Sequence, residues 1–442
     1  MNKNIIFMGF FLLIAFSVFS QSINLEQARE LGLINSRSLA RYEMQIRSSI
    51  LDERSQLYAM LPQISAGYSA SMQFLKDWQF VNPIEEYSIG ANLSITQIIF
   101  QGGKNFVQKA IAKIATESVR IDARNEYFNV IDSVDNAYYS VLEAKAALEA
   151  EEMSLRAAEI GHSIAEVRQM SGMINQGDYL KALADKEARE NSRNQARRNL
   201  TLAGNKFKSL IGIDGNLELE QISFDNYNDI LSRLGTITDE QADALFEIFW
   251  DIIIDSNLSL AKAAINTERA KRNYTLAKRD WTPTITASLL SSDFNFLPSF
   301  RTSGSMSVSL RGTIPIDFWV LTNRLEKSRI SRDSANIDYT NTEDALEHEL
   351  LNSLYNIFSQ AGTVLSARRS LEYTEKHFEY VMQRYRLSQS SVSELNDATS
   401  LFINSRNSLN RASYGFLQNL SKLRTLCSID DEAELLELLT LR

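Results

Sequence analysis

The sequence predicts a mainly α-helical protein with four β-strands, built from two copies of one unit. Proline breaks helices and interrupts central strands, and in this 442-residue chain it is confined to two short blocks. The five prolines are Pro62, Pro83, Pro283, Pro298 and Pro315. Around the blocks, Ser38–Arg41 followed by Pro62 matches Ser259–Lys262 followed by Pro283 at a constant shift of 221 residues. We therefore expect each unit to contain a helix, a strand pair and two further helices.

Apolar residues recur every seven positions along both long segments that lack proline. The first repeat contains Val107, Ile114, Ile121, Phe128 and, after one six-residue step, Val134, Val141, Leu148 and Leu155. The second contains Ile330, Ile337, Leu350, Ile357, Val364, Leu371, Phe378 and Tyr385, with Asp344 opposite Phe128. Such a repeat predicts helices wound against neighbours.

The expected helix lengths suggest how the helices are arranged. Helices over 104–170 and 320–387 would each be about 100 Å long, and those over 25–60 and 175–212 about 55 Å. Two short helices stacked end to end thus match one long helix. This arithmetic predicts a cylinder whose wall alternates long helices with stacked pairs of short ones.

The domain organisation follows from the duplication. Residues 1–20 are predicted to be a secretory signal, because Lys3 precedes an apolar run from Ile5 to Phe19. The first repeat is expected over 21–214, a linker at the middle of the helical wall over 215–244, the second repeat over 245–430 and a C-terminal tail over 431–442. The linker is expected to be irregular or to form short helices outside the wall.

Four strands are predicted from alternating apolar and polar residues, over 63–80, 85–98, 284–296 and 303–315. A period of two with one apolar face indicates half-buried strands. Two environments are compatible with this pattern. One is a soluble sheet whose apolar face packs on a core, and the other is a membrane barrel with its apolar face toward lipid. Four strands cannot close a barrel, so the second alternative requires several chains.

Composition excludes several functions. A formal charge of −9 argues against nucleic acid as a partner. His162, His348 and His377 lack metal-ligand spacing, and no nucleophile or phosphate-binding motif is present, so we expect no cofactor and no enzyme activity. The single cysteine, Cys427, matches Ile211 of the first repeat and is expected to be a small buried residue.

At this point the sequence resembles the TolC-type outer-membrane efflux proteins over nearly its whole length after the signal. The matching segments are the helix start Ile23–Ala28, the helix-to-strand junctions Leu61–Ile64 and Thr282–Ile285, and the strand-to-helix junctions Ile99–Gly103 and Ile314–Asp317. The resemblance implies a homotrimer in which four strands from each chain form a twelve-stranded barrel in outer-membrane lipid. Below the barrel, an α-helical tunnel would cross the periplasm to a periplasmic adaptor protein and an inner-membrane pump of the RND or ABC type.

The function that this resemblance implies is a passive exit duct of a tripartite efflux or type I secretion system. The alternative is a periplasmic coiled-coil scaffold whose strands form a small soluble sheet.

The resemblance also suggests a gate at the periplasmic end. Glu394 and Asp397 match a pair of family aspartates at the constriction, and Tyr385 matches a tyrosine that helps to latch it. Glu394 and Asp397 are three residues apart and so share one helix face. In the first copy Asp178 is the only corresponding carboxylate, and Ser390 replaces the family's nearby arginine. The alternative role for these acids is to complement the dipole at a helix start.

The helical hairpins are expected to turn at 171–177 and 387–391. The resemblance implies that adaptor tips dock at these turns. The expected docking residues are Gly172, Met173, Ile174, Gly177, Ser388, Gln389 and Ser390.

Overall fold

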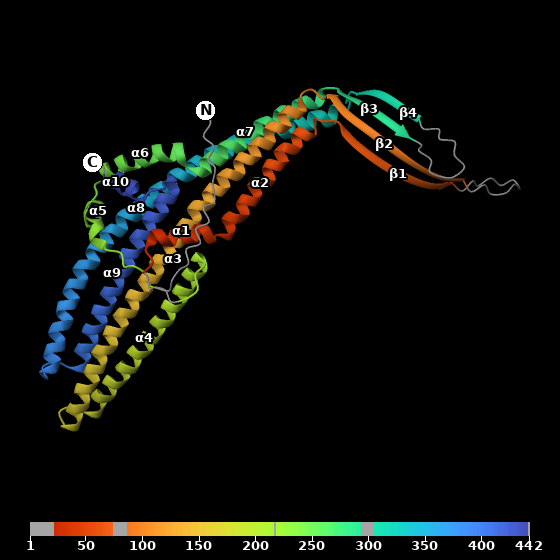
Figure 1. Ribbon diagram of the computed structural model, residues 1–442. Coiled ribbons are helices and arrows are strands. Elements are labelled where there is room, and N and C mark those ends of the chain that lie inside the picture. The colour runs from red at the N-terminus through yellow and green to blue at the C-terminus, as the bar shows by residue number, and fades with distance from the viewer. Residues whose placement is uncertain (1–21, 74–85, 216–217, 293–304, 441–442) are drawn as a thin grey trace.

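The computed structural model describes residues 22–73, 86–215, 218–292 and 305–440, and shows a long helical body with a sheet extending from one end (Figure 1). The expected signal segment at 1–20 lies outside the described residues. So do the predicted strand residues 74–80, 85, 293–296 and 303–304, together with 216–217 of the linker and 441–442 of the tail.

Two helical hairpins form the lower part of the body. In the first, α3 (Lys104–Met170) is followed by α4 (Gln176–Ile211), and in the second α8 (Phe318–Arg386) is followed by α9 (Val392–Cys427). The seven-residue repeat lies in their packed interface: Phe128, Val134, Leu350 and Ile357 are each at most 1% exposed. α3 packs against α9, so the four helices form one layer.

The helix expected over 25–60 is interrupted at Ser36, giving α1 (Leu25–Asn35) and α2 (Arg37–Tyr58). Ser36 caps α2 by accepting a hydrogen bond from the backbone N–H of Leu39 at 3.3 Å. At this joint the Asn35 side chain donates to the last carbonyl of α4, Ile211, at 2.8 Å. α2 therefore continues the line of α4 toward the sheet.

A joint of the same geometry lies between α6 (Asp239–Ser256) and α7 (Leu258–Lys278). Ser256 Oγ donates to the carbonyl of Cys427 at 2.7 Å, and Asn257 Nδ2 donates to that of Leu426 at 2.8 Å. α7 thereby stacks on α9, and the upper layer has the order α2, α3, α7, α8. Cys427 is fully buried, and burial raises the pKa of its thiol to about 12.

Short elements cover the middle of the body. They are η1 (Phe224–Tyr227), α5 (Asn228–Leu234) and the C-terminal α10 (Glu432–Thr440). α6 begins at Asp239, inside the segment expected to be linker, because Thr238 and Gln241 form a capping box. Leu231 and Leu435 are fully buried, so these pieces complete the largest hydrophobic core.

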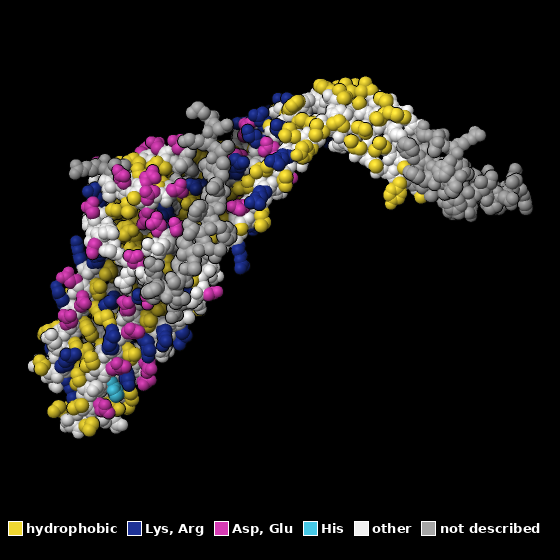
Figure 2. Space-filling view, in the orientation of Figure 1, with side chains coloured by type: hydrophobic (Ala, Val, Ile, Leu, Met, Phe, Trp, Pro, Cys, Tyr) yellow, Lys and Arg dark blue, Asp and Glu magenta, His cyan; other side chains and the backbone are white. Residues whose placement is uncertain are grey.

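The sheet is antiparallel with strand order β1 (Gln63–Gln73), β2 (Glu86–Phe100), β3 (Thr284–Ser292) and β4 (Ser305–Thr313). A 3₁₀ turn, η2 (Arg279–Trp281), precedes β3. The register places Ile64, Ile95, Leu289 and Val308 in one row across all four strands, and Ser288 opposite Ser309 on the other face. No described helix covers either face (Figure 1). The edge residues of the apolar row are consequently exposed, Ile64 by 69% and Val308 by 80%, whereas Ile95 and Leu289 between them are half-buried. Hydrophobic side chains gather on the surface of the sheet (Figure 2).

Candidate functional site

Both predicted hairpin turns lie at the end of the body farthest from the sheet (Figure 1). Gly172 has φ +71° and open space around its Cα, and Ser388 has φ +61°, so each turn uses one left-handed residue to reverse the chain. Asn175 caps α4 and Ser391 caps α9. Of the expected docking residues, Gly172, Met173, Gly177, Ser388 and Gln389 are exposed, whereas Ile174 and Ser390 are half-buried.

Tyr385, expected to latch the gate, is fully buried in the last turn of α8. Its hydroxyl donates to the carbonyl of Gly161 on α3 at 3.0 Å. The guanidinium of Arg168, also on α3, lies over the Tyr385 ring at 4.5 Å and donates to the Tyr385 carbonyl. The pKa of Tyr385 is raised above its ordinary value, chiefly by burial. The charge of Arg168 opposes this rise, and the charge of Asp178 adds to it. One residue thus joins the two hairpins through ring, hydroxyl and backbone.

Sequence reasoning missed Arg168. The resemblance points to the turn after Tyr385 for an arginine, and there Ser390 instead donates to the Val381 carbonyl at 3.4 Å. Arg168 comes from the other hairpin, 217 residues earlier in the chain. A weak signal was present, because a basic residue in the last turn of a helix complements its dipole.

The three acidic candidates differ in what they contact. Glu394 is exposed, and its carboxylate accepts from the Ser391 N–H at 3.3 Å while Ser391 Oγ accepts from the Glu394 N–H at 3.1 Å. This capping box supports the helix-start role considered for Glu394. Asp397 is exposed and makes no hydrogen bond or ion pair with any described residue. Asp178 is also exposed, and its charge acts on Tyr385.

Few polar contacts hold the hairpins together near the turns. Lys181 Nζ donates to Ser393 Oγ at 3.1 Å, and Arg189 donates to Ser400 Oγ at 2.6 Å, both from α4 to α9. A small apolar cluster that includes Tyr385 and Leu395 fills the space between the helices. The turn end is therefore joined by a small cluster and a few side-chain hydrogen bonds.

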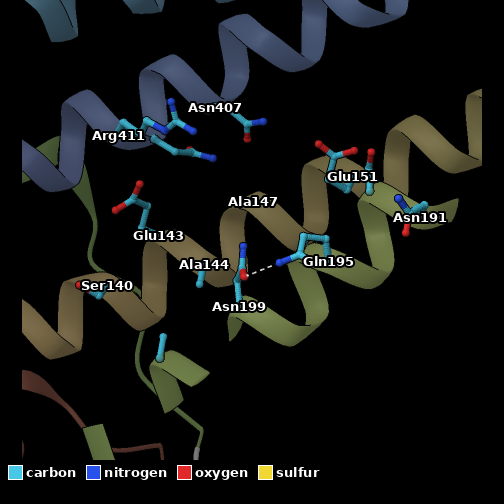
Figure 3. Close-up of a pocket in the computed structure, with 14 residues that line it drawn as sticks. Ser140, Glu143, Ala144, Ala147, Glu151, Asn191, Gln195, Asn199, Asn407 and Arg411 are labelled. Atoms are coloured by element: carbon cyan, nitrogen blue, oxygen red, sulfur yellow. Dashed lines mark hydrogen bonds between the residues drawn. The ribbon is translucent and has the colours of Figure 1, made fainter. Parts of the chain in front are cut away.

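Farther from the turns, α4 and α9 diverge around a polar cavity of about 630 Å³ whose floor is α3 (Figure 3). Glu151 of α3, Asn191 of α4 and Asn407 of α9 line it. Burial raises the pKa of Glu151. Within the described part of the chain, no group of three or more His, Cys, Asp or Glu side chains is arranged to hold a metal ion.

None of the described helices is both long enough and apolar enough to cross a bilayer.

Comparison with known proteins identifies relatives by family and by fold. The model of the outer membrane efflux protein family matches residues 29–213 and 251–427. A comparison with curated proteins finds no match.

Solved structures give the same fold at low identity. The CmeC outer membrane channel of Campylobacter jejuni superposes with a TM-score of 0.73 at 14% identity, covering 93% of this chain and 88% of that one. VceC, an outer membrane protein of Vibrio cholerae, superposes with a TM-score of 0.72 at 15% identity, covering 91% of this chain and 95% of that one. The open state of the MtrE outer membrane channel of Neisseria gonorrhoeae superposes with a TM-score of 0.69 at 14% identity, covering 91% of this chain and 88% of that one. The family model spans most of the chain, and the protein therefore belongs to the outer membrane efflux protein family.

Proposed function

We propose that the protein is the passive exit duct of a tripartite efflux or type I secretion system, a homotrimer anchored in the outer membrane. The observation that carries this proposal is the sheet, whose apolar row is exposed and whose opposite face is polar. Such a sheet is stable where lipid lies against one face and water against the other. A soluble scaffold would instead bury the apolar face, and no described helix does so (Figure 1).

The open edges of the sheet support a trimer. β1 and β4 each have a neighbour on one side only, which leaves unpaired backbone groups on the other. In the antiparallel order, β4 of one chain runs opposite to β1 of the next, so three chains close a twelve-stranded barrel with an even strand number. Closure of the ring removes every edge.

The two edges of the helical layer also support a contact between neighbouring chains. On α2, the exposed apolar residues Met44, Leu51 and Tyr58 recur every seven positions. On α8, at the opposite edge, Ile330 and Ile337 have the same spacing and are each 61% exposed. A seven-residue stripe left open on both edge helices fits a head-to-tail interface, which closes into a ring when the rotation permits.

We also infer that the two halves arose by duplication. The joint contacts from Asn35 to Ile211 and from Ser256 to Cys427 occupy matched positions of the two repeats. The residues that follow, Gly212 and Ser428, both have positive φ.

The first test is membrane fractionation. An outer-membrane trimer that dissociates on heating supports the duct, whereas release of the chain with the periplasmic fraction supports the coiled-coil scaffold.

A lysine placed on the apolar face should prevent this assembly. Val308→Lys is expected to abolish trimers in the outer membrane, because a basic residue facing mid-bilayer lipid costs about 2–4 kcal/mol. The matched control is Ser309→Lys, one residue along the same strand on the polar face. Equal trimer yields from the two variants would contradict the orientation of the sheet.

We propose that the turn end is the periplasmic gate, closed by the Tyr385–Arg168 contact and narrowed by carboxylates of three chains. Replacement of Asp397 by alanine is expected to change single-channel conductance and to weaken block by multivalent cations. Glu394→Ala should have the smaller effect on block, because the Glu394 carboxylate is engaged in the capping box. Glu375→Ala on α8, away from the turns, serves as the control. Unchanged block in the Asp397 variant would exclude a carboxylate ring there.

The exposed turns are proposed to dock the periplasmic adaptor, which connects the duct to an RND or ABC pump that supplies the energy. Met173→Asp places a charge on an apolar tip residue that is 71% exposed, and should reduce adaptor crosslinking several-fold while trimers still form. Leu202→Asp, equally exposed on α4 but far from the turn, should leave crosslinking intact. Full crosslinking with the Met173 variant would place docking elsewhere.

A further inference from the structure

A second polar cavity, of about 500 Å³, lies where α3, α7 and α8 meet the sheet. Lys104 opens α3 four residues after β2 ends, and Asp280 lies four residues before β3 begins. Arg324 and Lys327 come from the start of α8, and Gln108 and Asn273 add neutral donors. The cavity is therefore assembled from segments that flank three of the four strands.

The charges of this cavity do not balance. Asp280 is shared by two cations: its Oδ1 lies 2.8 Å from Lys104 Nζ and its Oδ2 lies 3.1 Å from Arg324 Nη1. Lys327 is exposed and makes no ion pair within the described residues. Three cations thus face one carboxylate, in a chain whose formal charge is −9. A concave site with surplus positive charge and amide donors suits a phosphate group.

Neighbouring aromatic residues place the cavity at a membrane surface. Trp281 follows Asp280 directly, and its ring stacks on that of Phe318 at 5.8 Å. Trp319 is 70% exposed beside them. Exposed aromatic rings at the end of an apolar sheet mark the level of lipid headgroups. Arg324 lies six residues along α8, about 9 Å below Phe318, within reach of a long side chain extending to that level.

We propose that this cavity binds the phosphate of an anionic phospholipid in the periplasmic leaflet of the outer membrane. The inference rests on the proposed membrane location. Lys327 and Arg324 contact the phosphate, and Gln108 and Asn273 donate to its oxygens or to the headgroup. Each chain of the trimer contributes one site, so bound lipid ties the helical layer to the sheet at the level where the strands emerge.

The experiment titrates the detergent-extracted trimer with phosphatidylglycerol or phosphatidylcholine and counts bound lipid by native mass spectrometry. Lys327→Gln should weaken phosphatidylglycerol binding about fivefold and leave phosphatidylcholine binding unchanged. Asp280→Asn frees two cations and should tighten phosphatidylglycerol binding. Lys206→Gln is the matched control and should change neither affinity, because Lys206 is an exposed lysine on α4 away from the sheet that likewise makes no ion pair among the described residues.

Three results would overturn the inference. Equal affinities for the two lipids would exclude an anionic headgroup site. An unchanged affinity in the Lys327 variant would exclude it as well. This variant should fold normally, because Lys327 makes no ion pair among the described residues. Displacement of phosphatidylglycerol by an equal concentration of inorganic phosphate would identify a free-anion site instead. Failure of the wild-type chain to appear as an outer-membrane trimer would refute the proposed function and, with it, this inference.

Discussion

Replacing Arg168 with alanine is expected to open the proposed gate, raising single-channel conductance well above that of the wild-type protein. The guanidinium lies over the Tyr385 ring and donates to the Tyr385 carbonyl while only 9% exposed. A buried cation–π contact contributes about 2 kcal/mol, which corresponds to about a thirtyfold change in the closed-to-open ratio for each chain. In the proposed trimer three chains would share the gate, so the combined shift would exceed that of one chain.

Two further variants separate the parts of this contact. Tyr385→Phe removes only the hydroxyl donated to Gly161 and should open the gate less than Arg168→Ala. Arg168→Lys keeps the charge but loses the planar donor and should fall between the alanine variant and the wild type. Conductance in planar bilayers is the measurement. An alanine variant with wild-type conductance would show that Arg168 plays no part in closure.

Replacing Asp135 with alanine is expected to reduce the free energy of unfolding by about 3–5 kcal/mol. Asp135 is fully buried on α3, where it accepts from Arg29 Nε at 2.6 Å, Arg424 Nη2 at 2.8 Å and Ser421 Oγ at 2.8 Å. Removing its carboxylate leaves the two guanidinium groups with one ion-pair partner among the described residues, Glu432 of α10, which lies 2.8 Å from Arg29 and 3.8 Å from Arg424. The measurement is the thermal or denaturant unfolding of the detergent-solubilised protein.

Asp132, one turn earlier on α3, is the matched control. Burial raises the pKa of its carboxyl, and its Oδ1 has no partner among the described residues. Because the folded state holds this proton more tightly, stability is greatest below the ordinary carboxyl pKa and falls as pH rises through the raised value. Asp132→Asn should remove that fall and stabilise the protein at neutral pH. Equal destabilisation by both substitutions would indicate that the buried ion cluster has no special role.

Much of the helical body could be predicted from the sequence, because its determinants are periodic and local. The long helices observed over Lys104–Met170 and Phe318–Arg386 lie within two residues of the expected ranges, since both follow a seven-residue repeat with a single six-residue step and no proline. The break at Ser36 was missed, because the contact that accompanies it, from Asn35 to Ile211, joins residues 176 apart in the chain and leaves no local signal. Strand alternation indicated the two faces but neither the strand order nor the irregularity between Ile98 and Phe100.

The candidate gate could be predicted only in part. The resemblance points to Tyr385 as a latch, which stays a prediction. Its partner Arg168 comes from the other hairpin, and such long-range pairs leave no mark on local spacing. For Glu394 the sequence leaves two roles open, and its contacts to Ser391 favour the helix-start role.

The joints at Asn35 and Ser256 have a mechanical consequence. At this level two of the four helical columns, α4 with α2 and α9 with α7, are interrupted, and side-chain hydrogen bonds connect their halves. The other two columns, α3 and α8, continue without a break. A tilt of α4 or α9 at its joint breaks no intrahelical hydrogen bond there, although it shifts the packing of that helix against α3. Bending of the layer at this level is therefore resisted by fewer backbone hydrogen bonds than bending through four continuous helices would be.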